Sequence, residues 1–150
     1  MIAFDTNVLI YAENASDRGE RHARAAALLA RLANTGAIIP VQVLCEFVNV
    51  CRNKAVVPLD LAVGKVGNYQ LLFETPPTEV ADVQKAALVA VRYKLQFFDA
   101  LIVTVAARFG ADALLSEDMQ DGLEIEGLRI INPFNPANRE AIDRLLAIEP

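Results

Sequence analysis

The chain alternates between short apolar runs and longer segments in which apolar residues recur every three or four positions. Apolar runs without polar alternation are typical of strands that are covered on both faces. Five such runs are predicted as strands, at residues 2–5, 37–39, 73–76, 111–116 and 128–134. Helical spacing is found at residues 7–14, 20–36, 41–53, 59–73, 78–94, 97–110 and 138–148.

This order of elements predicts the fold class. Strands separated by helices require right-handed crossovers and form a parallel sheet with helices on both faces. We therefore expect a three-layer α/β/α sandwich with a mostly parallel central sheet. With 150 residues, the chain is predicted to form one domain over residues 1–150. Its core should span about residues 1–134, followed by a C-terminal helix at about residues 136–148.

Composition narrows the class of protein. The chain is 54% hydrophobic and 22% charged, which is typical of a folded domain and not of a disordered one. Its net charge of -5 gives no global sign of nucleic-acid binding, although local patches can override net charge. No apolar run approaches the ~20 residues that cross a bilayer, and the N-terminus lacks the pattern of a secretion signal. We expect a soluble cytoplasmic protein with no membrane partner.

Polar residues follow two of the predicted strands. Asp5, Thr6 and Asn7 end the first apolar run, and Ser116 and Asp118 end the run at residues 111–116. In open α/β sheets, ligands bind beyond the carboxyl ends of the strands, so these side chains are candidates for a site. Thr6 and Asn7 also suit the cap of the helix that follows, and the two roles are compatible.

Asp99 lies near the start of a segment that is apolar on nearly every side. Such a helix is buried, and an unpaired carboxylate there would cost several kcal/mol or become protonated. Two interpretations remain open for Asp99: a helix N-cap, or a residue of a functional site.

Glu46 belongs to a polar stripe of a predicted helix, together with Gln42, Asn49 and Asn53. A solvated face is the ordinary explanation of such a stripe. The stripe contains three amides and one acid, whereas solvated faces usually mix charges, so a site wall is the alternative.

The acids favour one kind of chemistry. Aspartate and glutamate supply the hard oxygen ligands that Mg²⁺ and Mn²⁺ prefer, and clustered carboxylates repel one another unless a cation neutralises them. His22 is expected on the surface, and Cys45 and Cys51 are expected as small buried hydrophobic residues. A zinc site or a nucleophile paired with histidine is therefore not expected.

The motifs together resemble the PIN-domain ribonucleases, specifically the VapC-type toxins of bacterial toxin–antitoxin pairs. The family opens with a strand ending in Asp, followed by Thr or Ser and then Asn, as in "FDTN" at Asp5. It has a Glu in the helix after the second strand, as in "VLCEFVNV" at Glu46. It has an Asp opening a late buried helix, as in "FFDALIVTVA" at Asp99, and a turn like "SED" at Ser116 and Asp118.

The resemblance implies Mg²⁺- or Mn²⁺-dependent endonucleolytic cleavage of RNA, an antitoxin partner and a homodimer. It makes the four acids direct or water-mediated metal ligands: Asp5, Glu46, Asp99 and Asp118. Thr6, Asn7 and Ser116 would orient these acids. Asn49 is a further candidate for this role, only because it lies on the same helical stripe as Glu46. Asp121 lies where some members have a further acid and is a weaker candidate. RNA contacts are predicted for four basic residues from an expected position in loops: Arg18, Arg21, Arg52 and Lys54.

Three other classes of protein share part of this pattern. A Mg-dependent phosphatase of the haloacid dehalogenase type needs a second Asp where this chain has Asn7, and a receiver domain needs a late-strand Lys that "RIINPF" lacks. A catalytically inactive PIN-like interaction module is the remaining one. The intact set of four acids argues against it, because a binding module has no reason to keep their mutual repulsion.

Overall fold

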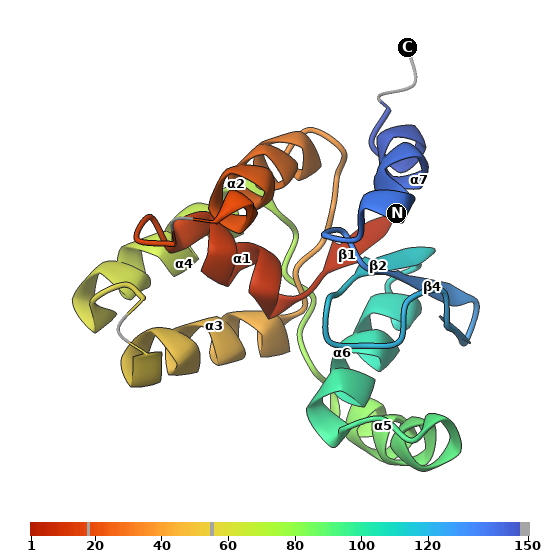
Figure 1. Cartoon of the computed structure of the whole chain (residues 1–150). Helices are drawn as coiled ribbons and strands as arrows, with labels where there is room; N and C mark the ends of the chain where they lie inside the picture. Colours follow the sequence, from red (N-terminus) through yellow and green to blue (C-terminus); the bar gives the residue numbers. More distant parts are fainter. Residues whose placement is uncertain (18, 55, 148–150) are drawn as a thin grey trace.

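A computed structural model describes residues 1–17, 19–54 and 56–147. Figure 1 shows the chain from its N-terminus to its C-terminus. The strands are β1 (Ile2–Phe4), β2 (Ala113–Leu115), β3 (Glu124–Ile125) and β4 (Leu128–Ile131). The helices are α1 (Thr6–Glu13), α2 (Glu20–Leu32), α3 (Val41–Lys54), α4 (Leu59–Leu72), α5 (Val80–Tyr93), α6 (Phe97–Arg108), the 3₁₀ turn η1 (Pro136–Asn138) and α7 (Arg139–Leu145).

The central sheet has the order β1-β2-β4-β3. Strand β1 pairs in parallel with β2, and β2 pairs in parallel with β4, while β3 joins β4 antiparallel. Phe4 is the register partner of Leu115, so the residues that leave these two strands, Asp5 and Ser116, lie side by side. The prediction of a mostly parallel sheet is confirmed.

Helices cover both faces of this sheet. Figure 1 shows α5 and α6 on one side, with α2 and α7 on the other, which confirms the three-layer sandwich. Helix α6 packs against both α5 and α3. All seven of its residues from position 100 to position 106 are buried, as expected for a helix that is apolar all round. Because α6 is fixed so firmly, its first turn delivers Asp99 to a defined place.

Some predicted strands are shorter than expected. Residues 37–39 and 73–76 contribute only isolated bridges, from Ile38 to Ala3 and from Ile38 to Glu74. The predicted run at residues 111–116 is a strand only over Ala113–Leu115. These segments extend the parallel sheet beyond β1 without forming full ladders.

The β3–β4 hairpin was not predicted. Its two turn residues, Glu126 and Gly127, have φ angles of 53° and 80°. Positive φ at both central positions is the geometry of a tight hairpin turn, and Gly adopts it readily while Glu does so rarely. The sequence signal was therefore weak.

Candidate functional site

Asp5 follows β1 directly and is the N-cap residue of α1. Its Oδ1 accepts a hydrogen bond from the Thr6 amide at 2.6 Å, and its Oδ2 accepts one from Ser116 Oγ at 2.8 Å. The Asp5 side chain is only 2% exposed. The cap that was considered for Thr6 and Asn7 is thus supplied by Asp5, which leaves their side chains available for other contacts.

Glu46 is joined to this group through Thr6. Thr6 Oγ1 donates to Glu46 Oε2 at 3.0 Å, and Gln42 Nε2 donates to Glu46 Oε1 at 3.1 Å. Gln42 was not predicted as a site residue, although it lies one turn before Glu46 on the polar stripe. Asn49 is exposed, and its Oδ1 accepts from Asn53 Nδ2 at 3.3 Å, so this part of the stripe does not bond to the acids.

The loop after β2 is fixed to α1 by two hydrogen bonds. Asn7 Nδ2 donates to Asp118 Oδ2 at 2.8 Å, and Tyr11 Oη donates to Glu117 Oε2 at 2.6 Å. Asn7 and Tyr11 are four residues apart and therefore lie on the same face of the helix. Together with the bond from Ser116 to Asp5, three successive loop residues are attached to the first strand and helix. Tyr11 and Glu117 were missed at the sequence level.

Asp99 occupies the first turn of α6 but does not cap it. The helix begins at Phe97 with Gln96 as its N-cap, so the capping interpretation of Asp99 was wrong. Among the described residues, no hydrogen bond reaches the Asp99 carboxylate. Burial raises the pKa of Asp99 to about 6, and the negative charges of the other three acids add to the shift.

The four acids therefore share one electrostatic environment. Burial also raises the pKa of Asp5, against the opposing effect of its two hydrogen bonds, and the charges of Glu46 and Asp118 raise it further. We call this group of Asp5, Glu46, Asp99 and Asp118 the acid crevice. Its oxygen donors fit a hard divalent cation. Over the described residues, however, no three acidic, histidine or cysteine side chains converge into a closed ligand set.

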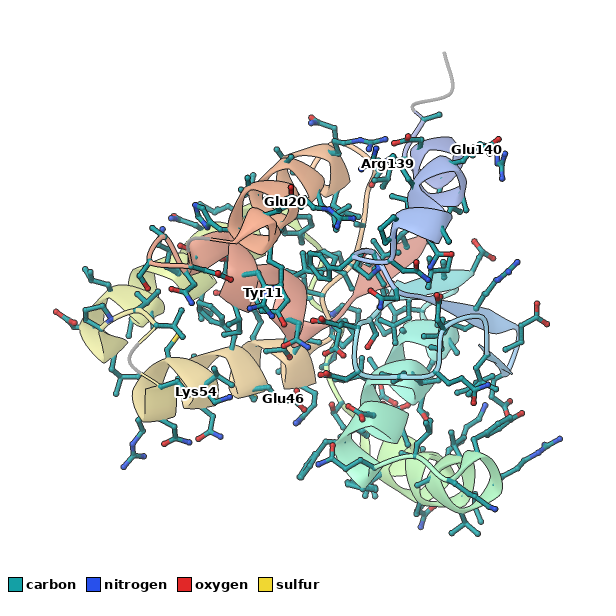
Figure 2. All side chains as sticks on the ribbon, in the orientation of Figure 1. Tyr11, Glu20, Glu46, Lys54, Arg139 and Glu140 are labelled. Carbon is teal, nitrogen blue, oxygen red and sulfur yellow. The ribbon has the colours of Figure 1, made fainter. Side chains whose placement is uncertain are left out.

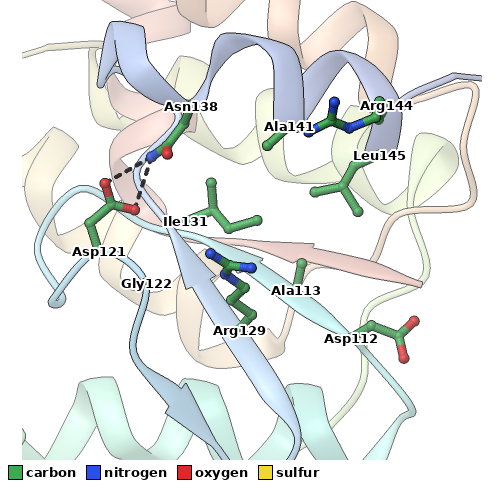
Figure 3. A pocket seen from close by; sticks show the side chains of 10 residues that line it. All are labelled: Asp112, Ala113, Asp121, Gly122, Arg129, Ile131, Asn138, Ala141, Arg144 and Leu145. Carbon is green, nitrogen blue, oxygen red and sulfur yellow. Dashed lines mark hydrogen bonds between the residues drawn. The ribbon is translucent and has the colours of Figure 1, made fainter.

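Asp121, the weaker candidate, lies elsewhere. Its carboxylate accepts hydrogen bonds from the Asn132 amide at 2.9 Å, from Asn135 Nδ2 at 2.9 Å and from Asn138 Nδ2 at 2.8 Å. Figure 3 shows Asn138 bonded to both carboxylate oxygens. Burial acts to raise the pKa of Asp121, but these hydrogen bonds and the charge of Arg129 lower it overall. Asp121 thus fixes the segment after β4 and is not part of the acid crevice.

Asp121 also lines a cavity of about 470 Å³ beneath α7. The cavity is bordered by Arg129, by Ile131 and by Leu145 (Figure 3). Cavity size alone does not identify a site, whereas acidic groups that raise one another's pKa values indicate a candidate functional site. The acid crevice is therefore the stronger candidate, although it is not this cavity.

The structure confirms some of the predictions for the remaining residues and contradicts others. His22 is half-buried rather than on the surface, and its Nδ1 lies 2.9 Å from the Tyr11 carbonyl oxygen. Cys51 is buried as expected, whereas Cys45 is exposed, so the prediction for Cys45 was wrong. Among the basic residues expected to contact RNA, Arg18 lies outside the described residues.

Arg52 and Lys54 are both exposed in the last turn of α3, and Lys54 lies about two helical turns beyond Glu46 (Figure 2). Arg21, by contrast, donates to Tyr11 and so connects to the loop of Asp118. Of the predicted RNA-contacting residues that the structure describes, Arg21 is thus the one with a bonded connection toward the acid crevice.

Comparison with known proteins agrees with the fold. The family model of the PIN domain matches residues 2–120 of the chain. No curated protein sequence matches the chain. Over the described residues, none of the helices combines the length and the apolar character needed to span a bilayer.

Several solved structures are similar to this one. VapC20 of Mycobacterium tuberculosis, described as a Sarcin-Ricin loop cleaving toxin, has a TM-score of 0.65 at 20% identity over 79% of this chain and 92% of its own. A toxin–antitoxin complex from Klebsiella pneumoniae gives a TM-score of 0.65 at 19% identity, covering 89% and 98%. VapBC2 of Rickettsia felis, bound to a promoter DNA fragment, gives 0.63 at 18% identity, covering 87% and 97%. At these identities the likeness establishes a shared fold.

Proposed function

The chain belongs to the PIN-domain family, and from this premise we propose that it is an endoribonuclease dependent on Mg²⁺ or Mn²⁺. We further propose that it is the toxin of a toxin–antitoxin pair and acts in the cytoplasm. The observation that supports the proposal is the acid crevice, in which four carboxylates from distant parts of the sequence repel one another when they are ionised. Such mutual repulsion is unfavourable unless a cation offsets it.

The acid crevice would bind the cation through Asp5, Glu46, Asp99 and Asp118. Because no three of the described acidic side chains converge into a closed ligand set, some of these contacts would be made through water. Mg²⁺ usually keeps several of its waters. When bound, the ion would polarise a phosphoryl oxygen and lower the pKa of a bound water, so no side-chain nucleophile is required.

The surrounding hydrogen bonds would keep the carboxylates in place. Ser116 and the Thr6 amide fix the two oxygens of Asp5, while the Thr6 hydroxyl orients Glu46. Asn7 orients Asp118 from one side only, which leaves the other carboxylate oxygen available. Mutation of groups that orient ligands in this way typically weakens metal affinity by about 10–100-fold.

The toxin role is supported by the neighbours and by charge. VapC20 is named as a Sarcin-Ricin loop cleaving toxin, and two further neighbours are toxin–antitoxin assemblies. An acidic crevice would attract a basic segment of an antitoxin, which would then occupy the place of RNA and metal. Electrostatic attraction between the crevice and the antitoxin would thus explain how the antitoxin inhibits the nuclease.

A second copy of the chain is the further partner that we propose. The outward face of α5 presents apolar side chains to solvent: Val80 is 80% exposed, Leu88 is 73% exposed and Val91 is 81% exposed. Glu79 precedes the helix, whereas Arg92 and Lys94 lie at its end. Two α5 helices packed antiparallel about a two-fold axis would cover the apolar faces and pair opposite charges.

The direct test is cleavage of a single-stranded RNA by the purified protein, with Mg²⁺ or Mn²⁺ and with EDTA. We expect cleavage that requires metal and that falls by at least about a hundredfold in Asp5→Asn, Glu46→Gln and Asp99→Asn. Asp60→Asn, which changes an exposed carboxylate of α4, is the matched control and should cleave normally.

Normal rates in any two of the three crevice variants would refute the assignment. Absence of cleavage by a folded, metal-loaded wild-type protein would favour the inactive interaction module. In cells, expression of the wild-type protein alone should arrest growth, and expression of Asp5→Asn should not.

A further inference from the structure

An RNA strand that enters the acid crevice needs cations or stacking surfaces at its edge, because the carboxylates repel its phosphates. Several basic side chains of the described residues are already paired with acids, as in Lys65–Glu13, Arg108–Asp82 and Arg144–Glu140. Arg21 also pairs with an acid, Asp17, but it lies in addition over the ring of Tyr11, whose hydroxyl contacts the loop of Asp118. The guanidinium carbon of Arg21 lies 4.6 Å from the centroid of the Tyr11 ring.

Arg21 is fixed by three contacts. Besides the stacking on Tyr11, its Nη1 donates to Tyr11 Oη at 3.2 Å and its Nε lies 3.5 Å from Asp17 Oδ2. The Arg21 side chain is nevertheless 52% exposed. The guanidinium therefore lies over the Tyr11 ring, while about half of the side chain remains open to solvent.

Tyr11 connects this guanidinium to the acid crevice. Its hydroxyl donates to Glu117, which directly precedes Asp118 in the chain. The rings of Tyr11 and Phe134 form an edge-to-face pair with a centroid distance of 5.2 Å and an interplanar angle of 78°. Helix α1 itself contacts α3, which carries Glu46 (Figure 2). The guanidinium thus rests on a rigid aromatic base beside the crevice.

Arg24, one turn further along α2, offers a contrast. Its guanidinium donates to the carbonyl oxygens of Phe134 at 3.1 Å and of Pro133 at 3.4 Å. Those hydrogen bonds attach the Arg24 guanidinium to the backbone of the segment that carries Phe134. The Arg24 guanidinium also lies over an aromatic ring, 5.9 Å from the centroid of Phe134, but only the ring beneath Arg21 bonds to the loop of Asp118.

We propose that Arg21, supported by Tyr11, is the site on which an unpaired RNA base stacks next to the acid crevice; this inference rests on the proposed ribonuclease function. Bases of single-stranded RNA stack on aromatic rings and on the plane of arginine guanidinium groups. The site therefore takes a nucleotide of a single strand or loop. A basic antitoxin segment is the less suitable occupant, because Arg21 would repel it.

The test measures RNA binding separately from cleavage. The Asp99→Asn protein, which should not cleave, is titrated against a fluorescently labelled single-stranded oligoribonucleotide, and binding is followed by anisotropy. Arg21→Ala in this background should weaken binding by about tenfold or more, as expected for the loss of one stacked base. Arg31→Ala is the matched control, since Arg31 is an exposed arginine of the same helix that pairs with Asp143, and its affinity should stay within about twofold.

Arg21→Lys distinguishes stacking from simple charge. Lysine keeps the positive charge but has no planar group, so we expect it to bind RNA as weakly as Arg21→Ala. Full recovery of affinity in Arg21→Lys would overturn the stacking site, as would unchanged affinity in Arg21→Ala. Unchanged affinity for RNA with altered affinity for a basic peptide would assign Arg21 to a protein partner instead.

The outcome also separates this inference from the proposed function. If the parent protein binds RNA and the wild type cleaves it, but Arg21→Ala has no effect, only the stacking site fails. If the parent does not bind RNA and the wild type does not cleave it, the ribonuclease proposal fails and the stacking site fails with it.

Discussion

Replacing Asp99 by Asn tests the electrostatic repulsion in the acid crevice, because the free energy of unfolding can be measured without any assay of activity. The substitution keeps the shape of the side chain and removes one negative charge. Because the pKa of Asp99 is raised in the folded protein, folding favours its protonated form. In the absence of metal, the ionised carboxylate therefore destabilises the wild type, increasingly as the pH rises from about 4 to above 6.

The size of the effect follows from the shift. An increase in pKa from 3.8 to about 6 corresponds to at most about 3 kcal/mol, at about 1.4 kcal/mol per unit. Solvent reaches the half-buried side chain, so we discount this to about 1.5–2 kcal/mol. A negative charge in the first turn of a helix stabilises it by about 0.5 kcal/mol, which Asn loses. Asp99→Asn should therefore gain about 1 kcal/mol, or about 3 °C in Tm for a chain of this size.

Thermal melts of both proteins measure this. In EDTA at pH 7.5, Asp99→Asn should melt about 3 °C higher than the wild type, and the difference should vanish near pH 4. Mn²⁺ at ten times its Kd should stabilise the wild type by about 1.4 kcal/mol and Asp99→Asn by less. If the wild type does not respond to metal and Asp99→Asn is the less stable protein in EDTA, Asp99 supports the fold and is not a ligand.

Two further predictions concern the acid crevice and one concerns the proposed dimer interface. Because protonated Asp99 cannot bind a cation, the apparent Kd for Mn²⁺ by calorimetry should be about tenfold weaker at pH 5 than at pH 7; equal values would contradict the pKa of about 6. Ser116→Ala removes a donor from the buried Asp5 carboxylate, so urea unfolding should show a loss of about 1–3 kcal/mol, against less than about 0.5 kcal/mol for the exposed control Ser16→Ala. Val91→Asp, on the outward face of α5, should convert a dimer to a monomer in light scattering, and an unchanged mass would move the interface elsewhere.

The positions of the site residues at the strand ends could be predicted, because they follow from the geometry of a parallel sheet. An apolar run ending in Asp5 and another ending in Ser116 indicate parallel strands, and parallel strands bring their carboxyl ends to one edge of the sheet. The register of Phe4 with Leu115 confirms this placement. The link between the strand end and α3 also follows from the fold, since Thr6 contacts Glu46 as soon as α1 packs on α3.

Details that depend on backbone geometry or on packing were not predictable in this way. The helical pattern correctly placed the start of α6 at Phe97, but the two aromatic residues before Asp99 give no capping signal, so Gln96 could not be inferred as the N-cap. The contact of Tyr11 with Glu117 joins residues 106 positions apart and leaves no local pattern. Cys45 and Cys51 are separated by about 240° around a helix, which should have excluded the prediction that both are buried.

The most direct measurement of the central claim is an anomalous difference map from crystals grown with Mn²⁺. We predict a peak between Asp5, Glu46, Asp99 and Asp118, about 2.0–2.6 Å from at least one carboxylate oxygen, with the remaining acids in contact directly or through water. The peak should disappear in crystals of Asp5→Asn. A well-ordered crevice without a peak at millimolar Mn²⁺, or a peak only at the cavity beneath α7, would contradict the assignment of the four acids as a metal centre.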